Sequence, residues 1–158
     1  MKQEEFPAGE ENINIRPMYV EDIRRVMTIE KQVFDHPWPR EAFLTYLLSS
    51  LPHEYIVAEN QELLLGYAGA HEKNEKFHLV NMAVKAGWQR RGIGSLLLNR
   101  IFKLGREKSL SQIFLEVRES NRAAISFYEQ HNFRQQALRR NYYTDNNENA
   151  IVMVRSLK

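Results

Sequence analysis

The sequence contains no cysteine. This absence excludes disulfide bonds, zinc sites built from thiolates and a cysteine nucleophile. It is compatible with a reducing compartment, and the cytoplasm is the location we expect. A transmembrane helix needs about 18 consecutive apolar residues, and no apolar run approaches that length. The N-terminus resembles neither a signal peptide nor a transit peptide, so we expect no membrane partner.

Internal repeats and low-complexity segments are also lacking in the 158 residues. The chain is 43% hydrophobic and 27% charged, which is typical of a globular domain. A length in this range fits one hydrophobic core. We therefore expect a flexible tail over residues 1–12 and a single domain over residues 13–158.

The net charge of +2 is unevenly distributed along the chain. Residues 1–79 contain 8 Lys/Arg and 14 Asp/Glu, and residues 80–158 contain 14 Lys/Arg and 6 Asp/Glu. The split suggests an anionic ligand on the C-terminal half and a cationic partner on the N-terminal half; a solvated surface of mixed sign is the alternative. A nucleic-acid-binding module is disfavoured, because no run of Lys/Arg alternates with aromatic residues as single-strand binding requires.

Hydrophobic periodicity predicts seven strands and four helices. The strands are expected at about residues 12–18, 54–59, 63–71, 77–84, 112–118, 133–143 and 150–157. The helices are expected at about 20–34, from 39 onward, at 93–108 and at 121–131. This order predicts an α/β or α+β sandwich around one mixed sheet.

The segment Gln89-Arg90-Arg91-Gly92-Ile93-Gly94-Ser95 joins a predicted strand to a predicted helix. Its glycines let the backbone approach a ligand, and the first N–H groups of the helix present the positive end of its dipole. Two adjacent arginines add full charges. The segment therefore predicts a site for a phosphate or a pyrophosphate.

Other interpretations of this segment fit less well. A nucleoside-triphosphate loop needs a lysine before its Ser/Thr, and Gly94-Ser95 has none. A dinucleotide fingerprint needs a third small residue where Leu97 stands, although Glu116 lies near the distance expected of a ribose-binding acid. A helix that merely begins with glycine would leave the arginine pair unexplained.

The chain resembles the GCN5-related N-acetyltransferase (GNAT) family, and within it the RimI-type ribosomal-protein alanine N-acetyltransferases. The resemblance covers roughly residues 13–157. It is carried by Phe34 with Pro37-Trp38, Asn81-Met82-Ala83-Val84 followed by the Gln89–Gly94 motif, Leu115-Glu116-Val117-Arg118, Asn121 with Ala123-Ala124-Ile125, Tyr128-Glu129, and Arg139-Arg140-Asn141-Tyr142-Tyr143. In one departure, Asn132 replaces a frequent glycine before Phe133; asparagine tolerates the left-handed conformation needed there.

The resemblance implies a GNAT fold, with a mixed, mostly antiparallel sheet of about seven strands flanked by four helices. It implies transfer of acetyl from acetyl-CoA, without a metal, to the N-terminal alanine of a ribosomal protein of the small-subunit S18 type, by direct attack in a ternary complex. The implied protein is a monomer or weak dimer that needs no nucleic acid. The implied cofactor-binding residues are Met82, Ala83, Val84, Gln89, Arg90, Arg91, Gly92, Ile93, Gly94, Ser95 and Asn121.

Two residues are candidates for acid–base catalysis. Glu116 interrupts the apolar run of a predicted central strand, where desolvation is expected to raise its pKa and its basicity; a solvated polar face is the alternative. In relatives the matching glutamate accepts a proton, directly or through water. Tyr128 matches the tyrosine that protonates the coenzyme A thiolate in relatives, although most helical tyrosines are core aromatics. Backbone N–H groups of residues 82–84 match those that hold the thioester carbonyl in relatives.

Three residues are candidates for binding the acceptor. Trp38, at the break between two helices, and Tyr142, entering the last hairpin, are expected to line a peptide groove; only one of Tyr142 and Tyr143 can face it. Glu30 is an acid on an apolar helix stripe, and either meets the charge of the acceptor or pairs with a buried arginine. The acidic N-terminal half would attract a basic ribosomal protein.

The chemistry of the amine favours an N-terminal acceptor. An α-amine with a pKa of about 7.8 costs about 1 kcal/mol to deprotonate at pH 7, against about 4.6 kcal/mol for a lysine at about 10.4. Broader N-terminal or lysine acetylation, acetylation of a small amine and a catalytically inactive coenzyme A-binding module remain alternatives. The five histidines show no metal-ligand spacing and are interpreted as scattered polar or core residues.

Overall fold

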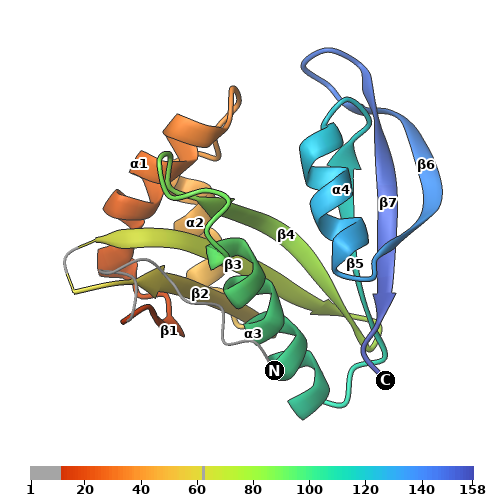
Figure 1. Cartoon of the computed structure of the whole chain (residues 1–158). Helices are drawn as coiled ribbons and strands as arrows, with labels where there is room; N and C mark the ends of the chain where they lie inside the picture. The colour runs from red at the N-terminus through yellow and green to blue at the C-terminus, as the bar shows by residue number, and fades with distance from the viewer. Residues whose placement is uncertain (1–11, 62) are drawn as a thin grey trace. The chain divides into compact units, whose positions relative to one another are not determined.

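The computed structural model describes residues 12–61 and 63–158 (Figure 1); most of the predicted tail, residues 1–11, lies outside this range. The strands are β1 (Asn14–Pro17), β2 (His53–Glu59), β3 (Leu64–Lys73), β4 (Lys76–Val84), β5 (Gln112–Arg118), β6 (Arg134–Tyr143) and β7 (Glu148–Ser156). The helices are α1 (Ile23–Val33), α2 (Arg40–Leu47), α3 (Ile93–Glu107) and α4 (Arg122–Gln130), with a short 3-10 helix, η1 (Val20–Asp22), before α1. The predicted elements are confirmed, with small shifts at their ends.

The strands form one sheet in the order β1-β2-β3-β4-β5-β7-β6. β1 pairs antiparallel with β2, and β7 pairs antiparallel with both β5 and β6. β4 and β5 are parallel neighbours, with Phe77 opposite Ile113 and His78 opposite Phe114. The predicted mixed sheet with mostly antiparallel strands is therefore confirmed.

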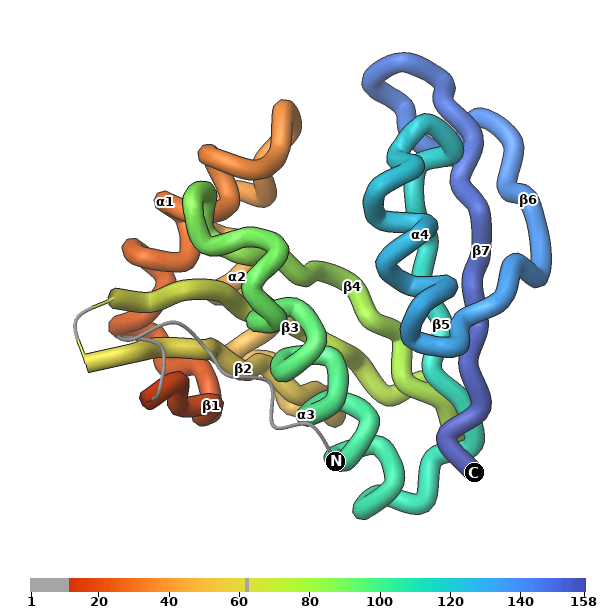
Figure 2. The backbone as a smooth tube through the Cα atoms, in the orientation of Figure 1, coloured from red at the N-terminus to blue at the C-terminus, as the bar shows by residue number. Residues whose placement is uncertain are grey.

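The chain divides into two compact units, and the smooth trace in Figure 2 shows the path of the chain through each of them. Among the described residues, the first unit contains those up to Ala70 together with Asn81–Ile101, and the second contains His71–Val80 with Phe102–Lys158. Within the part of the chain that the structure describes, every helix is too short or too polar to span a membrane.

In the first unit, neighbouring residues of β3 contact helices on opposite faces of the sheet. A Cβ atom on Gly66 would lie 2.8 Å from the Ala83 carbonyl oxygen and 3.1 Å from the Leu97 side chain, so α3 packs where only a glycine fits. The next residue, Tyr67, is fully buried and meets Phe43 of α2 edge-on, with 5.8 Å between ring centres. The alternation of side chains along the strand thus separates α2 from α3.

In the second unit, α4 ends where the sequence predicts a left-handed residue. Asn132 has a φ of 64°, and its N–H donates to the Glu129 carbonyl while the Phe133 N–H donates to the Tyr128 carbonyl. This ending turns the chain into β6, and the Phe133 ring is buried against Tyr128 and Phe102.

The outer strand β6 is irregular. Its register against β7 shifts between Gln135 and Ala137, and again between Arg139 and Tyr143. Nearly all of its residues are exposed, whereas the middle of β7 is buried. β7 therefore supplies the core of this hairpin, and β6 supplies side chains that face outward.

Candidate functional site

The segment between β4 and α3 has the backbone that a phosphate-binding loop needs. Gly87 and Gly92 both have a φ of 85°, and Arg90 has a φ of 61°. Positive φ values are costly for residues with side chains, so the conformation of Arg90 is held by its surroundings. The Trp88 N–H donates to the Lys85 carbonyl and closes the turn, and α3 begins directly after Gly92.

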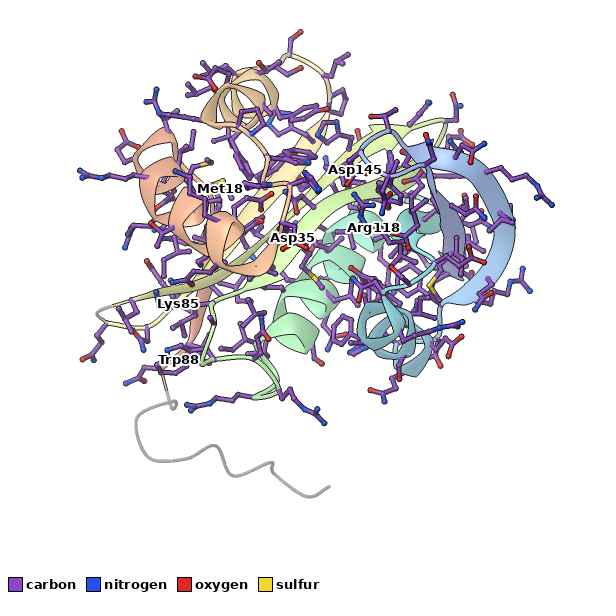
Figure 3. All side chains as sticks on the ribbon, turned by 90° about the horizontal axis from the view of Figure 1, so that it is seen from above. Met18, Asp35, Lys85, Trp88, Arg118 and Asp145 are labelled. Carbon is purple, nitrogen blue, oxygen red and sulfur yellow. The ribbon has the colours of Figure 1, made fainter. Side chains whose placement is uncertain are left out.

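Side chains of this loop add positive charge around the helix start. Arg90 and Arg91 are both exposed, and the Arg91 guanidinium packs over the Trp88 ring at 4.9 Å. The Gln89 amide donates to the Val84 carbonyl at 3.2 Å, which ties the loop to the end of β4. Figure 3 labels Lys85, the first residue after β4, and Trp88, which lies three residues further along the loop. Exposed guanidinium groups beside a helix N-terminus suit the diphosphate of coenzyme A.

A second group of polar residues in the first unit surrounds the side chain of Glu30. This residue is only 1% exposed. Its carboxylate accepts the Trp38 N–H at 2.9 Å and the Asn81 amide at 3.3 Å, and it also accepts the Tyr67 hydroxyl. The carboxylate thus ties α1 to the segment before α2 and to two strands.

The partners of Glu30 bear on its two interpretations, which were contact with the charge of the acceptor and pairing with an arginine. Burial raises the pKa of Glu30, while the hydrogen bonds from Trp38 and Asn81 oppose this rise. Among the described residues, the hydrogen-bond partners of Glu30 include no arginine, so the alternative that this acid is a buried partner for an arginine was wrong. The Trp38 ring in turn packs against Phe43 and Tyr46 of α2, at 5.4 and 5.3 Å. Glu30 therefore fixes the backbone of the predicted acceptor-binding segment, and its contact with an acceptor stays a prediction.

In the second unit, Glu116 of β5 lies among three polar groups, one from the adjacent strand β4 and two from β6, which is separated from β5 by β7. Its carboxylate contacts His78 Nε2 of β4 at 2.5 Å and Arg139 of β6 at 3.8 Å. Only 8% of the Glu116 side chain is exposed. Tyr142 is close enough for the negative charge of Glu116 to raise the pKa of its hydroxyl, although burial contributes more. The structure thus groups Glu116 with the predicted acceptor residue Tyr142.

The expected direction of the Glu116 pKa was wrong. Desolvation is the largest single influence and raises the pKa, as the sequence predicted, but the hydrogen bond and charge of His78 and the charge of Arg139 together outweigh it. The net pKa of Glu116 is lowered. Glu116 is therefore ionised at neutral pH and can accept a proton, but it is a weaker base than an isolated buried carboxylate.

The two candidates Asn121 and Tyr128, at the start of α4 and within it, have different local roles. The Asn121 side chain caps the helix by accepting the Ala124 N–H at 3.2 Å, so this residue precedes the helix rather than lying in it. The Tyr128 ring packs against Phe133, and burial, with a smaller contribution from Tyr143, raises the pKa of its hydroxyl. Tyr128 therefore keeps its proton at neutral pH, as a proton donor must. Whether Asn121 contacts the cofactor stays a prediction.

The consecutive tyrosines of β6 have different surroundings, although their rings meet edge-on with centres 5.0 Å apart. Tyr142 is 40% exposed and lies beside Arg139, whose guanidinium is 5.8 Å from the ring centre. The Tyr143 ring instead lies under Arg118, at 3.9 Å, and its pKa is raised to about 12, chiefly by burial. Arg118 also pairs with Asp145 at 2.9 Å, and the two lie side by side in Figure 3. Tyr143 thus belongs to the hairpin, while Tyr142 stays available to a ligand.

Sequence reasoning missed His78 and Arg139 as partners of Glu116. The five histidines show no metal-ligand spacing, so nothing in the sequence distinguishes His78 from the other four. Parallel pairing places His78 opposite Phe114, and Glu116 follows Phe114 by two residues on the same face of β5. That register was the missing signal, since helix and strand periodicity alone does not show which strands are neighbours.

Comparison with known proteins agrees with this geometry. Residues 23–133 match the model of the Acetyltransferase (GNAT) family. The N-alpha-acetyltransferase RimI of Mycobacterium tuberculosis is 32% identical over 154 residues, covering 94% of this chain and 95% of that protein. The [ribosomal protein bS18]-alanine N-acetyltransferase of Escherichia coli (strain K12) is 31% identical over 137 residues, covering 84% and 89%.

A solved structure shows the same arrangement of elements. The crystal structure of the ribosomal-protein-S18-alanine N-acetyltransferase from Escherichia coli superposes with a TM-score of 0.84 at 28% identity. The match covers 92% of this chain and 94% of that one. The resemblance drawn from the sequence motifs is thereby confirmed: the chain belongs to the GNAT family and is an acetyl-CoA-dependent N-acetyltransferase.

Proposed function

We propose that this protein transfers acetyl from acetyl-CoA to the N-terminal alanine of ribosomal protein bS18, in the cytoplasm and without a metal. The observation that carries the proposal is the 31% identity, over most of both chains, to an enzyme named for this reaction. The position of Glu116 supports it, because its ionised carboxylate and the ring of Tyr142, a residue predicted to bind the acceptor, both lie near the Arg139 guanidinium. An α-amine also costs less free energy to deprotonate at neutral pH than a lysine side chain does, which favours an N-terminal acceptor.

The loop of residues 89–95, with Met82, Ala83 and Val84 before it, is proposed to bind acetyl-CoA. Gly92, Ile93, Gly94 and Ser95 would present backbone N–H groups at the start of α3, while Arg90 and Arg91 would neutralise the diphosphate. The thioester supplies the activated acetyl group. Glu116 is proposed to take a proton from the amine, and Tyr128 to hold the proton that the departing thiolate needs.

The loop proposal predicts a specific loss of cofactor affinity. Changing Arg90 and Arg91 together to alanine should raise the KM for acetyl-CoA about tenfold or more, because two charge-assisted contacts to phosphate are removed. The kcat should change much less. Initial rates at varied acetyl-CoA measure both constants, and Arg100→Ala is the matched control, because Arg100 is an exposed arginine of α3, the helix that follows the loop. An unchanged KM in the double variant would contradict the assignment of this loop.

Trp38 and Tyr142 are each proposed to contact the acceptor, and Glu30 is proposed to act on it through the backbone of Trp38. The support is the hydrogen bond from the Trp38 N–H to Glu30 and the exposure of Tyr142 beside Glu116. The protein is proposed to act as a monomer or weak dimer, without direct binding to nucleic acid.

A direct test uses three synthetic peptides and mass spectrometry. One carries the alanine-starting N-terminus of bS18, the second is the same peptide blocked at its α-amine but containing lysine, and the third begins with a different residue. We expect the gain of one acetyl group on the first peptide only. Acetylation of the blocked peptide would redirect the proposal to lysine, and equal acetylation of the first and third would broaden it to N-termini in general.

A further inference from the structure

The contact between His78 and Glu116 gives the proposed base a partner that the sequence motifs do not contain. Parallel pairing sets His78 opposite Phe114, and their rings stack with centres 4.4 Å apart and planes 8° from parallel. The stacking fixes the plane of the imidazole, and its Nε2 atom lies 2.5 Å from Glu116 Oε2. The histidine is thus oriented toward the carboxylate by the sheet itself.

The two partners of Glu116 differ in what they can do with a proton. Arg139, the more distant at 3.8 Å, has a guanidinium group, which carries hydrogen-bond donors and no acceptor. An imidazole can exchange a proton near neutral pH. The side chain of His78 is 24% exposed, against 8% for Glu116, so His78 reaches solvent more readily than the carboxylate does.

The stoichiometry of the reaction requires one proton to leave the site in each turnover. A protonated α-amine loses two protons when its nitrogen forms the bond to the acetyl carbon. One proton ends on the coenzyme A sulfur as the carbon–sulfur bond breaks, and the other must leave for bulk water. A proton taken by the largely covered Glu116 therefore needs a path out of the site before the next turnover.

We propose that His78 is a positioning and proton-relay residue, which receives the proton of the acceptor amine from Glu116 and passes it to solvent. The inference rests on the proposed role of Glu116 as base. In this arrangement the tautomer of His78 with its proton on Nδ1 accepts on Nε2 the proton that Glu116 Oε2 has taken, and the imidazolium then releases its Nδ1 proton to water. The tautomer that remains donates from Nε2 to the ionised Glu116, and proton exchange with water restores the first tautomer before the next turnover. No redox change or further reactant is involved.

The test compares His78→Ala and His78→Gln with the wild type, using acetyl-CoA and the alanine-starting peptide. Glutamine can still donate a hydrogen bond to Glu116 but cannot carry a proton. We expect both variants to lower kcat about tenfold, a fraction of what full acid–base catalysis contributes, with little change in either KM. Added imidazole should restore the alanine variant in a saturable manner and leave the glutamine variant unchanged.

His131→Ala is the matched control, because His131 is a half-buried histidine of the same unit whose ring contacts the Phe127 carbonyl. It should retain wild-type kcat and show no response to imidazole. If His78→Gln has wild-type kcat, a hydrogen bond to Glu116 is sufficient and the relay is overturned. The kcat of His78→Gln tests the relay in this way even if His78→Ala fails to fold. A lowered kcat that imidazole does not restore in folded His78→Ala overturns it as well.

The outcomes separate this inference from the proposed function. Wild-type turnover in both His78 variants, with turnover lost in Glu116→Gln, would remove the relay and leave the base in place. Wild-type turnover in Glu116→Gln would instead remove the base. Acetylation of the alanine-starting peptide by the unmodified enzyme is measured independently of either result.

Discussion

Glu116→Gln is expected to lower kcat about 100- to 1000-fold, the range that a positioned acid or base contributes. Glutamine has nearly the same shape and still offers an oxygen to His78, but it cannot take a proton from the amine. The KM for acetyl-CoA should stay close to that of the wild type, because Glu116 is not among the residues proposed to hold the cofactor. Steady-state rates with the alanine-starting peptide measure the effect.

The control for this variant is Glu107→Gln, at an exposed position of α3. It makes the same chemical change and should leave kcat unaltered. Denaturation of Glu116→Gln at pH 7 must accompany the kinetics, because the substitution also removes the charge that faces Arg139. A folded Glu116→Gln protein with kcat within threefold of wild type would show that another group, or water alone, accepts the proton.

Glu30→Ala is expected to lower the free energy of unfolding by about 3 kcal/mol, because it leaves several buried donors without an acceptor. Those donors are the Trp38 N–H, the Tyr67 hydroxyl and the Asn81 amide. Glu41→Ala, at an exposed position of α2, should cost less than about 0.5 kcal/mol. Urea denaturation of the three proteins measures the difference. A loss under 1 kcal/mol for Glu30→Ala would contradict the structural role of the carboxylate.

Glu30→Gln adds a test through pH. Burial raises the pKa of Glu30 above its usual value of about 4.5, so the folded protein keeps this proton to higher pH than the unfolded chain does. The contribution of Glu30 to stability is therefore greatest in acid and declines as the pH rises through the raised pKa. The groups that face Glu30 are the Trp38 N–H, the Tyr67 hydroxyl and the Asn81 amide.

Glutamine has no such dependence, so its stability relative to the wild type should improve between pH 5 and pH 8. A difference that stays constant, or that reverses with pH, would mean that the carboxylate is held in its ionised form. The same variant should alter the KM for the peptide more than kcat if the backbone of Trp38 positions the acceptor.

Much of the fold follows from local patterns in the sequence. β5 reproduces its expected limits, and Asn132 takes the left-handed conformation that its place at the end of α4 requires. These features depend on side-chain alternation and on the conformational preference of single residues, both of which a sequence displays directly. The strand order was not predictable in the same way, because it depends on contacts between distant segments.

The candidate site shows where that limit matters. The sequence identified Glu116 from its unusual place in an apolar run, yet predicted the wrong sign for its pKa. The sign depends on His78 and Arg139, which lie 38 and 23 positions away in the chain and meet Glu116 only through strand pairing. Glu30 was recognised as anomalous for the same reason as Glu116, and its partners likewise come from distant segments.

The irregular pairing of β6 limits how this hairpin can vary in length. Four steps along β6 from Arg139 to Tyr143 match two steps along β7 from Ala150 to Glu148, so the excess is an even number. Successive strand residues point to opposite sides, and an even excess leaves the orientation of Tyr143 over Arg118 unchanged. Insertion or deletion of a single residue between these points would exchange the faces of the sheet to which Tyr142 and Tyr143 point. Insertion or deletion of two residues would leave each tyrosine on its present face. Homologous enzymes that keep this arrangement should therefore differ here in steps of two.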